Sequence, residues 1–278
     1  MNSGIFISFE GIDGTGKSVQ IRLLANALER RGHNVFMTKE PGDALMGSNV
    51  GAGIRELVFK NPTTKSMRPG VADLLFLADH IQTAGDVAEK VAEGHTVLTD
   101  RYADSQFAYA ASETKQCPEW ALRYYHEQYG IVPDITVLLV ARGPQVIREF
   151  TPTHANLDLS GEISIAGRVS AEEDIAWALG RAKGRKGTEA GKQDGKRWND
   201  VAEQRKIQNA YLTQIGKEPR TLLVHVWEES SIDDVHERVL TGVLSKLIQS
   251  GNYRLVPGEP VGRLVRSPDE PTNYAPSY

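Results

Sequence analysis

A glycine-rich segment near the start of the chain carries the residues best suited to chemistry on phosphates. Residues 11–18 read G-I-D-G-T-G-K-S, which matches the pattern G-x-x-x-x-G-K-[ST]. Glycines in this pattern let backbone N–H groups surround a phosphate, and the N-terminus of a following helix adds a favourable dipole. Lys17 is placed to bridge two phosphates, and the Ser18 hydroxyl is placed to ligate Mg²⁺. The residues expected to bind ATP are Gly11, Asp13, Gly14, Thr15, Gly16, Lys17, Ser18 and Val19.

A second group of candidate residues follows a short apolar stretch. Asp100 and Arg101 come directly after the residues H-T-V-L-T at 95–99. An aspartate at the end of a buried strand can hold a Mg²⁺ ion in a phosphotransferase, so Ser18 and Asp100 are the predicted metal ligands. Arginine can bind phosphoryl oxygens through two nitrogens, which lysine cannot do. Asp-Arg-Tyr alone would more often be a helix cap with a surface arginine, but its place at the ligand edge of the sheet predicts that Asp100 and Arg101 act on the phosphates.

Alternating strands and helices must position these two groups. Apolar runs predict strands at residues 4–10, 34–38, 95–99, 135–140 and 221–226. Helical spacing predicts helices at residues 18–31, 51–60, 70–93, 118–129 and 232–249. This alternation indicates an α/β fold of the P-loop NTPase type, with a doubly wound parallel sheet flanked by helices. Ligands of such sheets bind beyond the carboxyl ends of the strands, where residues 11–18, 40–42 and 100–101 all fall.

The remaining segments predict an insertion and a tail. Residues 1–250 are expected to form one kinase domain, and about residues 150–198, rich in glycine and basic residues, would form an expanded lid with a short helix at 171–179. Residues 251–278 hold five prolines and little apolar periodicity, so a disordered tail or a strap on the surface is expected.

Composition excludes several classes of partner. The net charge of −4 argues against a general nucleic-acid-binding surface, which is normally basic. The one cysteine, Cys117, cannot form an intrachain disulfide and fits a reducing compartment. The sequence has no signal peptide and no apolar run of about 18 residues, so a cytoplasmic protein without a membrane partner is expected.

Further motifs resemble those of the thymidylate kinase family. They are Glu40-Pro41-Gly42, Leu74-Leu75-Phe76-Leu77-Ala78, Asp100-Arg101-Tyr102, Ser105-Gln106-Phe107-Ala108-Tyr109 and Pro133-Asp134-Ile135-Thr136, in family order. The resemblance covers about residues 4–145 and resumes weakly around 194–212. It implies Mg²⁺-assisted transfer of a phosphoryl group from ATP to thymidine monophosphate, and a homodimer.

The resemblance also implies roles for single residues. Phe76 would stack on the acceptor base, and Arg55 and Arg101 would grip the acceptor phosphate. The predicted acceptor site comprises Glu40, Arg55, Phe76, His80, Arg101, Ser105, Gln106 and Tyr109, and the predicted catalytic residues are Asp13, Lys17, Arg101 and Arg185. For Phe76 the alternative is packing in the core, for Arg55 a solvated charge, and for Tyr109 an ordinary half-buried aromatic.

The chain also departs from the family pattern. The family usually has an arginine, donating to the thymine carbonyl, where this chain has His80, and a glycine where it has Asp43. Its phosphate loop lacks an arginine, so a catalytic arginine should come from the lid, where Arg181, Arg185 and Arg197 are the candidates. Two alternatives therefore stay open. One is a kinase for another deoxynucleotide or a modified pyrimidine nucleotide, and the other is a non-catalytic nucleotide-binding module.

Overall fold

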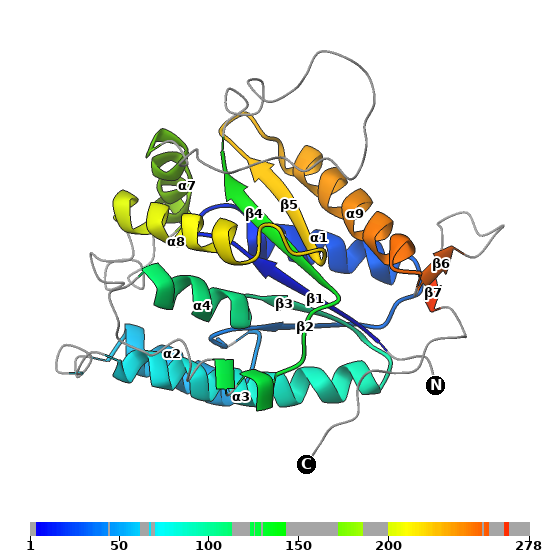
Figure 1. The fold of residues 1–278 in the computed structure, drawn as a ribbon, viewed down its shortest axis with the longest axis horizontal. Coiled ribbons are helices and arrows are strands. Elements are labelled where there is room, and N and C mark those ends of the chain that lie inside the picture. The colour runs from blue at the N-terminus through cyan, green and yellow to red at the C-terminus, as the bar shows by residue number, and fades with distance from the viewer. Residues whose placement is uncertain are drawn as a thin grey trace.

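A central sheet of five parallel strands organises the protein (Figure 1). The computed structural model describes residues 4–43, 45–61, 67, 70–112, 123–124, 126–128, 130–142, 172–185, 200–251, 253–255 and 264–266. The strands are β1 Ile5–Glu10, β2 Val35–Lys39, β3 Thr96–Asp100, β4 Ile135–Ala141 and β5 Thr221–Val226, in the order β2-β3-β1-β4-β5. Every pairing between them is parallel, which confirms the predicted P-loop NTPase fold.

Helices cover both faces of this sheet. They are α1 Lys17–Glu29, α2 Asn49–Phe59, α3 Val71–Ala92, α4 Ala103–Ser112, α7 Glu172–Arg185, α8 Val201–Gln214 and α9 Ile232–Gln249. Helices α1 and α9 pack together on one face, whereas α3, α4, α7 and α8 cover the other and α2 packs beside α3 (Figure 1). The alternation of side chains along β1 explains this division, because Ile7 and Phe9 pack toward α1 while Phe6 packs toward α3.

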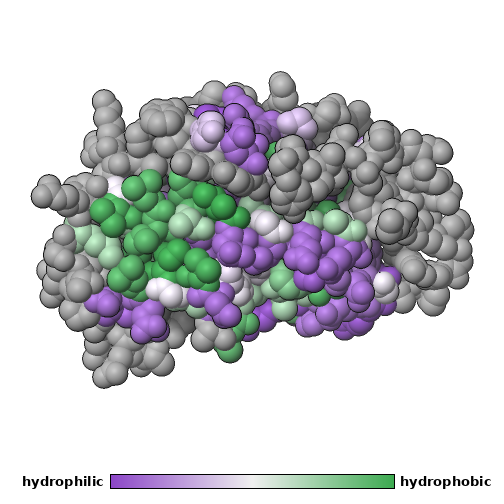
Figure 2. Space-filling model, turned by 90° about the horizontal axis from the view of Figure 1, so that it is seen from below, coloured by the Kyte–Doolittle hydropathy of each residue, from purple (hydrophilic) through white to green (hydrophobic). Residues whose placement is uncertain are grey.

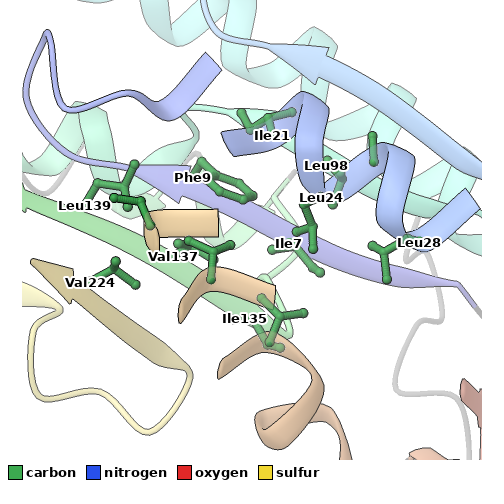
Figure 3. Packing of buried hydrophobic residues seen from close by; sticks show 14 of the residues in the cluster. Ile7, Phe9, Ile21, Leu24, Leu28, Leu98, Ile135, Val137, Leu139 and Val224 are labelled. Atoms are coloured by element: carbon green, nitrogen blue, oxygen red, sulfur yellow. The ribbon is translucent and has the colours of Figure 1, made fainter. Parts of the chain in front are cut away.

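The core lies mainly between β1, β4 and the helices α1 and α9. Ile7 and Phe9 of β1 meet Ile21, Leu24 and other apolar side chains of α1 (Figure 3). Strands β1, β3 and β4 are buried along their whole length, as expected for the inner strands of a parallel sheet. This rigid core holds the carboxyl ends of β1 and β3 next to each other.

Two helices were not anticipated from the sequence. In α8, buried glutamines occupy positions where an amphipathic helix normally has apolar residues. Gln208 uses its side-chain amide to continue the pairing of β4, since it accepts from Ala141 N at 2.8 Å and donates to Ala141 O at 3.0 Å. In α4, Asp104 and Ser105 are buried, so its apolar pattern is equally obscured.

The predicted insertion and tail lie largely outside the described residues. Helix α7 is the described part of the insertion, and only 123–124 and 126–128 of the helix predicted at 118–129 are described, all helical. In the tail, β6 Tyr253–Leu255 and β7 Leu264–Arg266 pair as an antiparallel hairpin beside α9, which was not anticipated. Among the helices that the structure describes, none has the length and apolar character needed to span a bilayer.

Candidate active site

The glycine loop between β1 and α1 closes around the side chain of Lys17. Gly11 and Gly16 have φ angles of 128° and 100°, a conformation that residues with a Cβ rarely adopt. Lys17 is 6% exposed, and its Nζ donates to the carbonyls of Gly11 at 2.9 Å and Ile12 at 2.8 Å. Thr15 Oγ1 donates to the Ile12 carbonyl as well, at 3.0 Å. Burial, with the positive charge of Arg101, lowers the pKa of Lys17 to about 8.

The predicted metal ligands meet where α1 begins. Ser18 Oγ donates to Asp100 Oδ2 at 2.6 Å, although 82 positions separate the residues in sequence. Both are hard oxygen ligands, which suit Mg²⁺. The described residues contain no cluster of three histidine, cysteine or acidic side chains that would hold a metal without help.

Arg101 links the end of β3 to the glycine loop. Its Nη2 lies 2.6 Å from Asp13 Oδ1, and its Nη1 donates at 3.2 Å to Gly11 O, Ser105 Oγ and Tyr211 OH. Its backbone is left-handed with φ of 74°, a conformation that costs a non-glycine residue about 1–3 kcal/mol. The surrounding contacts from the loop, α4 and α8 therefore hold this guanidinium in a strained but defined place.

A buried acid lies behind Arg101. Glu10 is fully buried at the end of β1, where its carboxylate accepts from Tyr102 N at 2.8 Å, Ser105 Oγ at 2.5 Å and Tyr211 OH at 3.2 Å. Burial and the nearby charge of Asp104 raise the pKa of Glu10 to about 8. Ser105, predicted to line the acceptor site, thus uses its hydroxyl within this buried network.

The E-P-G turn begins one residue after β2, on the other side of Arg101. Glu40 is 5% exposed, and its backbone N–H donates to Asp100 O at 3.0 Å. His80 on α3 places its Nδ1 2.9 Å from Glu40 Oε1. Asp43 does not project a free charge, because Lys39 pairs with it at 2.9 Å and two backbone N–H groups donate to it. These contacts outweigh partial burial and lower the pKa of Asp43.

Asp79 ties this turn to α2 and α3. It is 1% exposed and accepts from Ser48 Oγ at 3.1 Å and from the backbone N–H of Gly42. Ser48 in turn caps α2 by accepting from Gly51 N at 2.8 Å. Burial, and then the charge of Glu40, raises the pKa of Asp79 to about 7. A Cβ at residue 51 would lie 2.1 Å from Asp79 Oδ1, so the Asp79 carboxylate can occupy this place only because residue 51 is a glycine.

Aromatic and basic side chains of α2, α3 and α4 gather beside the turn. Phe76 is half-buried outside the core, with its ring 5.9 Å from Phe59, and Arg55 lies 5.4 Å over the Phe59 ring. Gln106 Nε2 donates to Phe76 O at 3.1 Å. Tyr109 lies 5.4 Å below the Arg101 guanidinium, and burial raises its pKa to about 12.

The lid candidates are only partly described. Arg185 is the last residue of α7, and its side chain lies outside the described residues, as does the whole of Arg197. Arg181 lies 5.1 Å over the ring of Trp177 on the same helix. The assignment of Arg185 as catalytic stays a prediction.

Comparison with known proteins identifies the family to which the chain belongs. The sequence profile described as thymidylate kinase matches residues 9–148, half of the chain. The chain belongs to the thymidylate kinase family. Curated relatives named thymidylate kinase are 40% identical in Clavibacter sepedonicus, 37% in Bifidobacterium longum strain DJO10A and 35% in an Exiguobacterium species. Each match covers 49% of this chain and 63%, 66% and 63% of the relative, respectively. The chain thus spans somewhat less than two thirds of these relatives.

Several residues of the site escaped the sequence analysis. Glu10 had a detectable signal, since it is an acid at the end of an otherwise apolar strand that leads into the glycine loop. Asp79 directly follows the family segment Leu74–Ala78 but looks like an ordinary helix-surface acid in the sequence. Tyr211 and Ala178 lie on α8 and α7, beyond the thymidylate kinase match, and only the fold brings them to the loop.

The contact between Gly14 and α7 gives a first prediction. Gly14 has φ of 83°, and a Cβ there would lie 1.7 Å from the carbonyl oxygen of Ala178. We expect Gly14→Ala to push α7 away from the loop, lower stability by about 1–3 kcal/mol and weaken ATP binding. Thermal unfolding and ATP titration by calorimetry measure both effects. Gly85→Ala is the control, because that glycine of α3 has open space around it and should gain about 0.5–1 kcal/mol. Equal melting temperatures for the two variants would contradict the packing argument.

Proposed function

We propose that this chain transfers the γ-phosphoryl group of ATP to thymidine monophosphate, giving thymidine diphosphate and ADP. The observation that carries the proposal is Arg101, whose guanidinium touches the glycine loop through Gly11 and Asp13 and stacks over Tyr109 on α4. A guanidinium that lies between the ATP side and the monophosphate side of the site can bind a phosphate group of each substrate at the same time. Phosphoryl transfer needs little beyond such alignment and neutralisation of charge.

The donor side uses the glycine loop. Backbone N–H groups of residues 11–18 would surround the β-phosphate, and Lys17 would turn from its carbonyl partners to the phosphate oxygens. Its lowered pKa leaves it mostly protonated at neutral pH, so it still carries the charge that the phosphates need. Ser18 and Asp100 would hold Mg²⁺, which supplies neutralising charge to the phosphates when bound.

The acceptor side uses the turn after β2 and the helices beside it. The proposed base site lies at Phe76, whose ring packs against Phe59, and Arg55 lies over the ring of Phe59. Arg55 and Arg101 would bind the acceptor phosphate, whose oxygen attacks the γ-phosphorus as the bond to the β-phosphate breaks. An arginine of the insertion, with Arg185 as our candidate, would close over the transferring group and exclude water.

The decisive experiment measures products from ATP, Mg²⁺ and a panel of nucleoside monophosphates by chromatography. Thymidine diphosphate as the main product would support the proposal. Preference for another deoxynucleotide or a modified pyrimidine would favour a kinase with a different acceptor. This alternative arises because His80 stands where the family has an arginine. Binding of ATP without transfer to any monophosphate would leave a nucleotide-binding module.

We also propose that the chain forms a homodimer through α2 and α3. Figure 2 shows a hydrophobic patch on the face that carries these helices, beside a hydrophilic region. Val50, Val71 and Leu74 are 48%, 38% and 58% exposed, an apolar set that a monomer would leave in water. Leu74→Glu should shift the mass measured by light scattering from dimer to monomer, whereas Leu45→Glu, at an exposed leucine outside these helices, should not. A monomeric wild type would contradict this proposal. We propose the cytoplasm as the location, consistent with the single cysteine.

A further inference from the structure

A chain of buried side chains runs from the E-P-G turn to the segment after α4. His80 Nδ1 lies 2.9 Å from Glu40 Oε1, and His80 Nε2 lies 3.2 Å from His126 Nδ1. The edge of the Tyr102 ring packs against His80 with 4.6 Å between ring centroids. His80 is 1% exposed, so this histidine is enclosed on α3 with both ring nitrogens engaged by the protein.

The orientation of Glu40 depends on this histidine. Among the described residues, His80 is the one side chain that hydrogen-bonds to the Glu40 carboxylate, whose Oε2 has no partner there. The Glu40 side chain is only 6% exposed, so water cannot readily replace His80. Asp79 adds a second buried acid nearby, which makes a fixed donor to Glu40 more important.

The direction of the hydrogen bonds follows from the chemistry of the groups. A carboxylate only accepts, so the proton between Glu40 and His80 belongs on His80 Nδ1. Burial, and then the charge of His80, lowers the pKa of His126 to about 4, so His126 is neutral near pH 7. Asp104 and Arg220 also face His126, with opposite effects on its pKa. With the proton of His80 on Nδ1, its Nε2 is placed to accept from His126 Nδ1–H, and this contact holds the imidazole ring in place.

We propose that His80 is a positioning residue that fixes the Glu40 carboxylate at the acceptor edge, and that it does not contact the acceptor base. The inference rests on the proposed function, because it concerns the acceptor site of that reaction. Base choice would then depend on the groups around Phe76 rather than on His80. His126 acts one step further away, by holding the imidazole of His80.

Two amide substitutions distinguish the roles of the two ring nitrogens of His80. The amide nitrogen of asparagine can lie near the place of Nδ1, whereas glutamine reaches toward the place of Nε2. We expect His80→Asn to keep the KM for thymidine monophosphate within about threefold of wild type. We expect His80→Gln and His80→Leu to raise that KM about tenfold or more, without changing the KM for ATP. His95→Asn is the control for a histidine outside the site, and melting temperatures verify folding.

The order of preference among nucleoside monophosphates distinguishes positioning from direct contact. A residue that touches the base would change this order when it is replaced, whereas a positioning residue would not. The proposal expects all His80 variants to keep the wild-type order of preference among thymidine, deoxyuridine and deoxycytidine monophosphates. A changed order in His80→Asn, or equal KM values in the asparagine and glutamine variants, would overturn it.

A measurement without turnover keeps the proposal separate from the kinase assignment. Histidine ¹⁵N NMR of the wild type should show the His80 proton on Nδ1, and its resonance should move in Glu40→Gln. A proton only on Nε2 would refute the geometry even if the enzyme is active. If the NMR result is as expected and no monophosphate is phosphorylated, the proposed function fails while the link between His80 and Glu40 stands.

Discussion

Replacing Lys17 by alanine is expected to reduce phosphoryl transfer by about 10³-fold, or about 4 kcal/mol of transition-state stabilisation. Lys17 is enclosed by the glycine loop, and its Nζ is held by the carbonyls of Gly11 and Ile12. Its charge cannot be replaced from solvent because the loop excludes water from this position. Steady-state rates of diphosphate formation, at saturating ATP and monophosphate, measure the effect.

The control for this variant is another lysine. Lys90→Ala removes a charge on α3 that pairs with Glu93 at 2.7 Å on the surface, and it should leave the rate within about twofold. Melting temperatures of both variants separate a catalytic loss from unfolding. Wild-type turnover in Lys17→Ala would show that the glycine loop does not bind the phosphates.

The second large effect is expected for Arg101→Lys, which keeps the charge. Lysine has one nitrogen, so it cannot reach Asp13 and the acceptors Gly11 O, Ser105 Oγ and Tyr211 OH from one position. We expect kcat/KM for the acceptor to fall about 10²-fold, or about 3 kcal/mol, with a smaller change in ATP affinity. Initial rates over a range of monophosphate concentrations give this ratio.

Arg22→Lys is the matched control, since Arg22 is exposed on α1. Its kinetics should equal those of wild type. If Arg101→Lys behaved in the same way, the fork geometry of Arg101 would have no role and only its charge would matter.

The sequence predicted the parts of the fold that local patterns encode. Strand β5 and helix α9 match the predicted residues 221–226 and 232–249, because both have regular apolar spacing and clear ends. Helices α4 and α8 were missed because Asp104, Gln204 and Gln208 occupy buried positions, and their burial depends on partners far away in the chain. Pattern analysis counts such residues as surface.

The same reasoning explains what was and was not predictable in the site. The glycine loop and Asp100-Arg101 each have a local motif and a place at the sheet edge, so their proximity could be expected. The bonds of Glu10 to Ser105 and Tyr211 cross 95 and 201 positions, and no spacing in the sequence encodes them. The contacts of His80 could not be predicted from the sequence either, because its partners Glu40 and His126 lie 40 and 46 positions away on either side.

Helices α7 and α8 both contact the predicted phosphate site. Helix α7 meets the glycine loop at Gly14, and α8 reaches Arg101 through the hydroxyl of Tyr211. Because each helix touches a different part of the site, a shift of either helix would change the surroundings of the phosphates. A spectroscopic label on an exposed residue of α7 or α8 would therefore report on occupation of the site without touching the ligand.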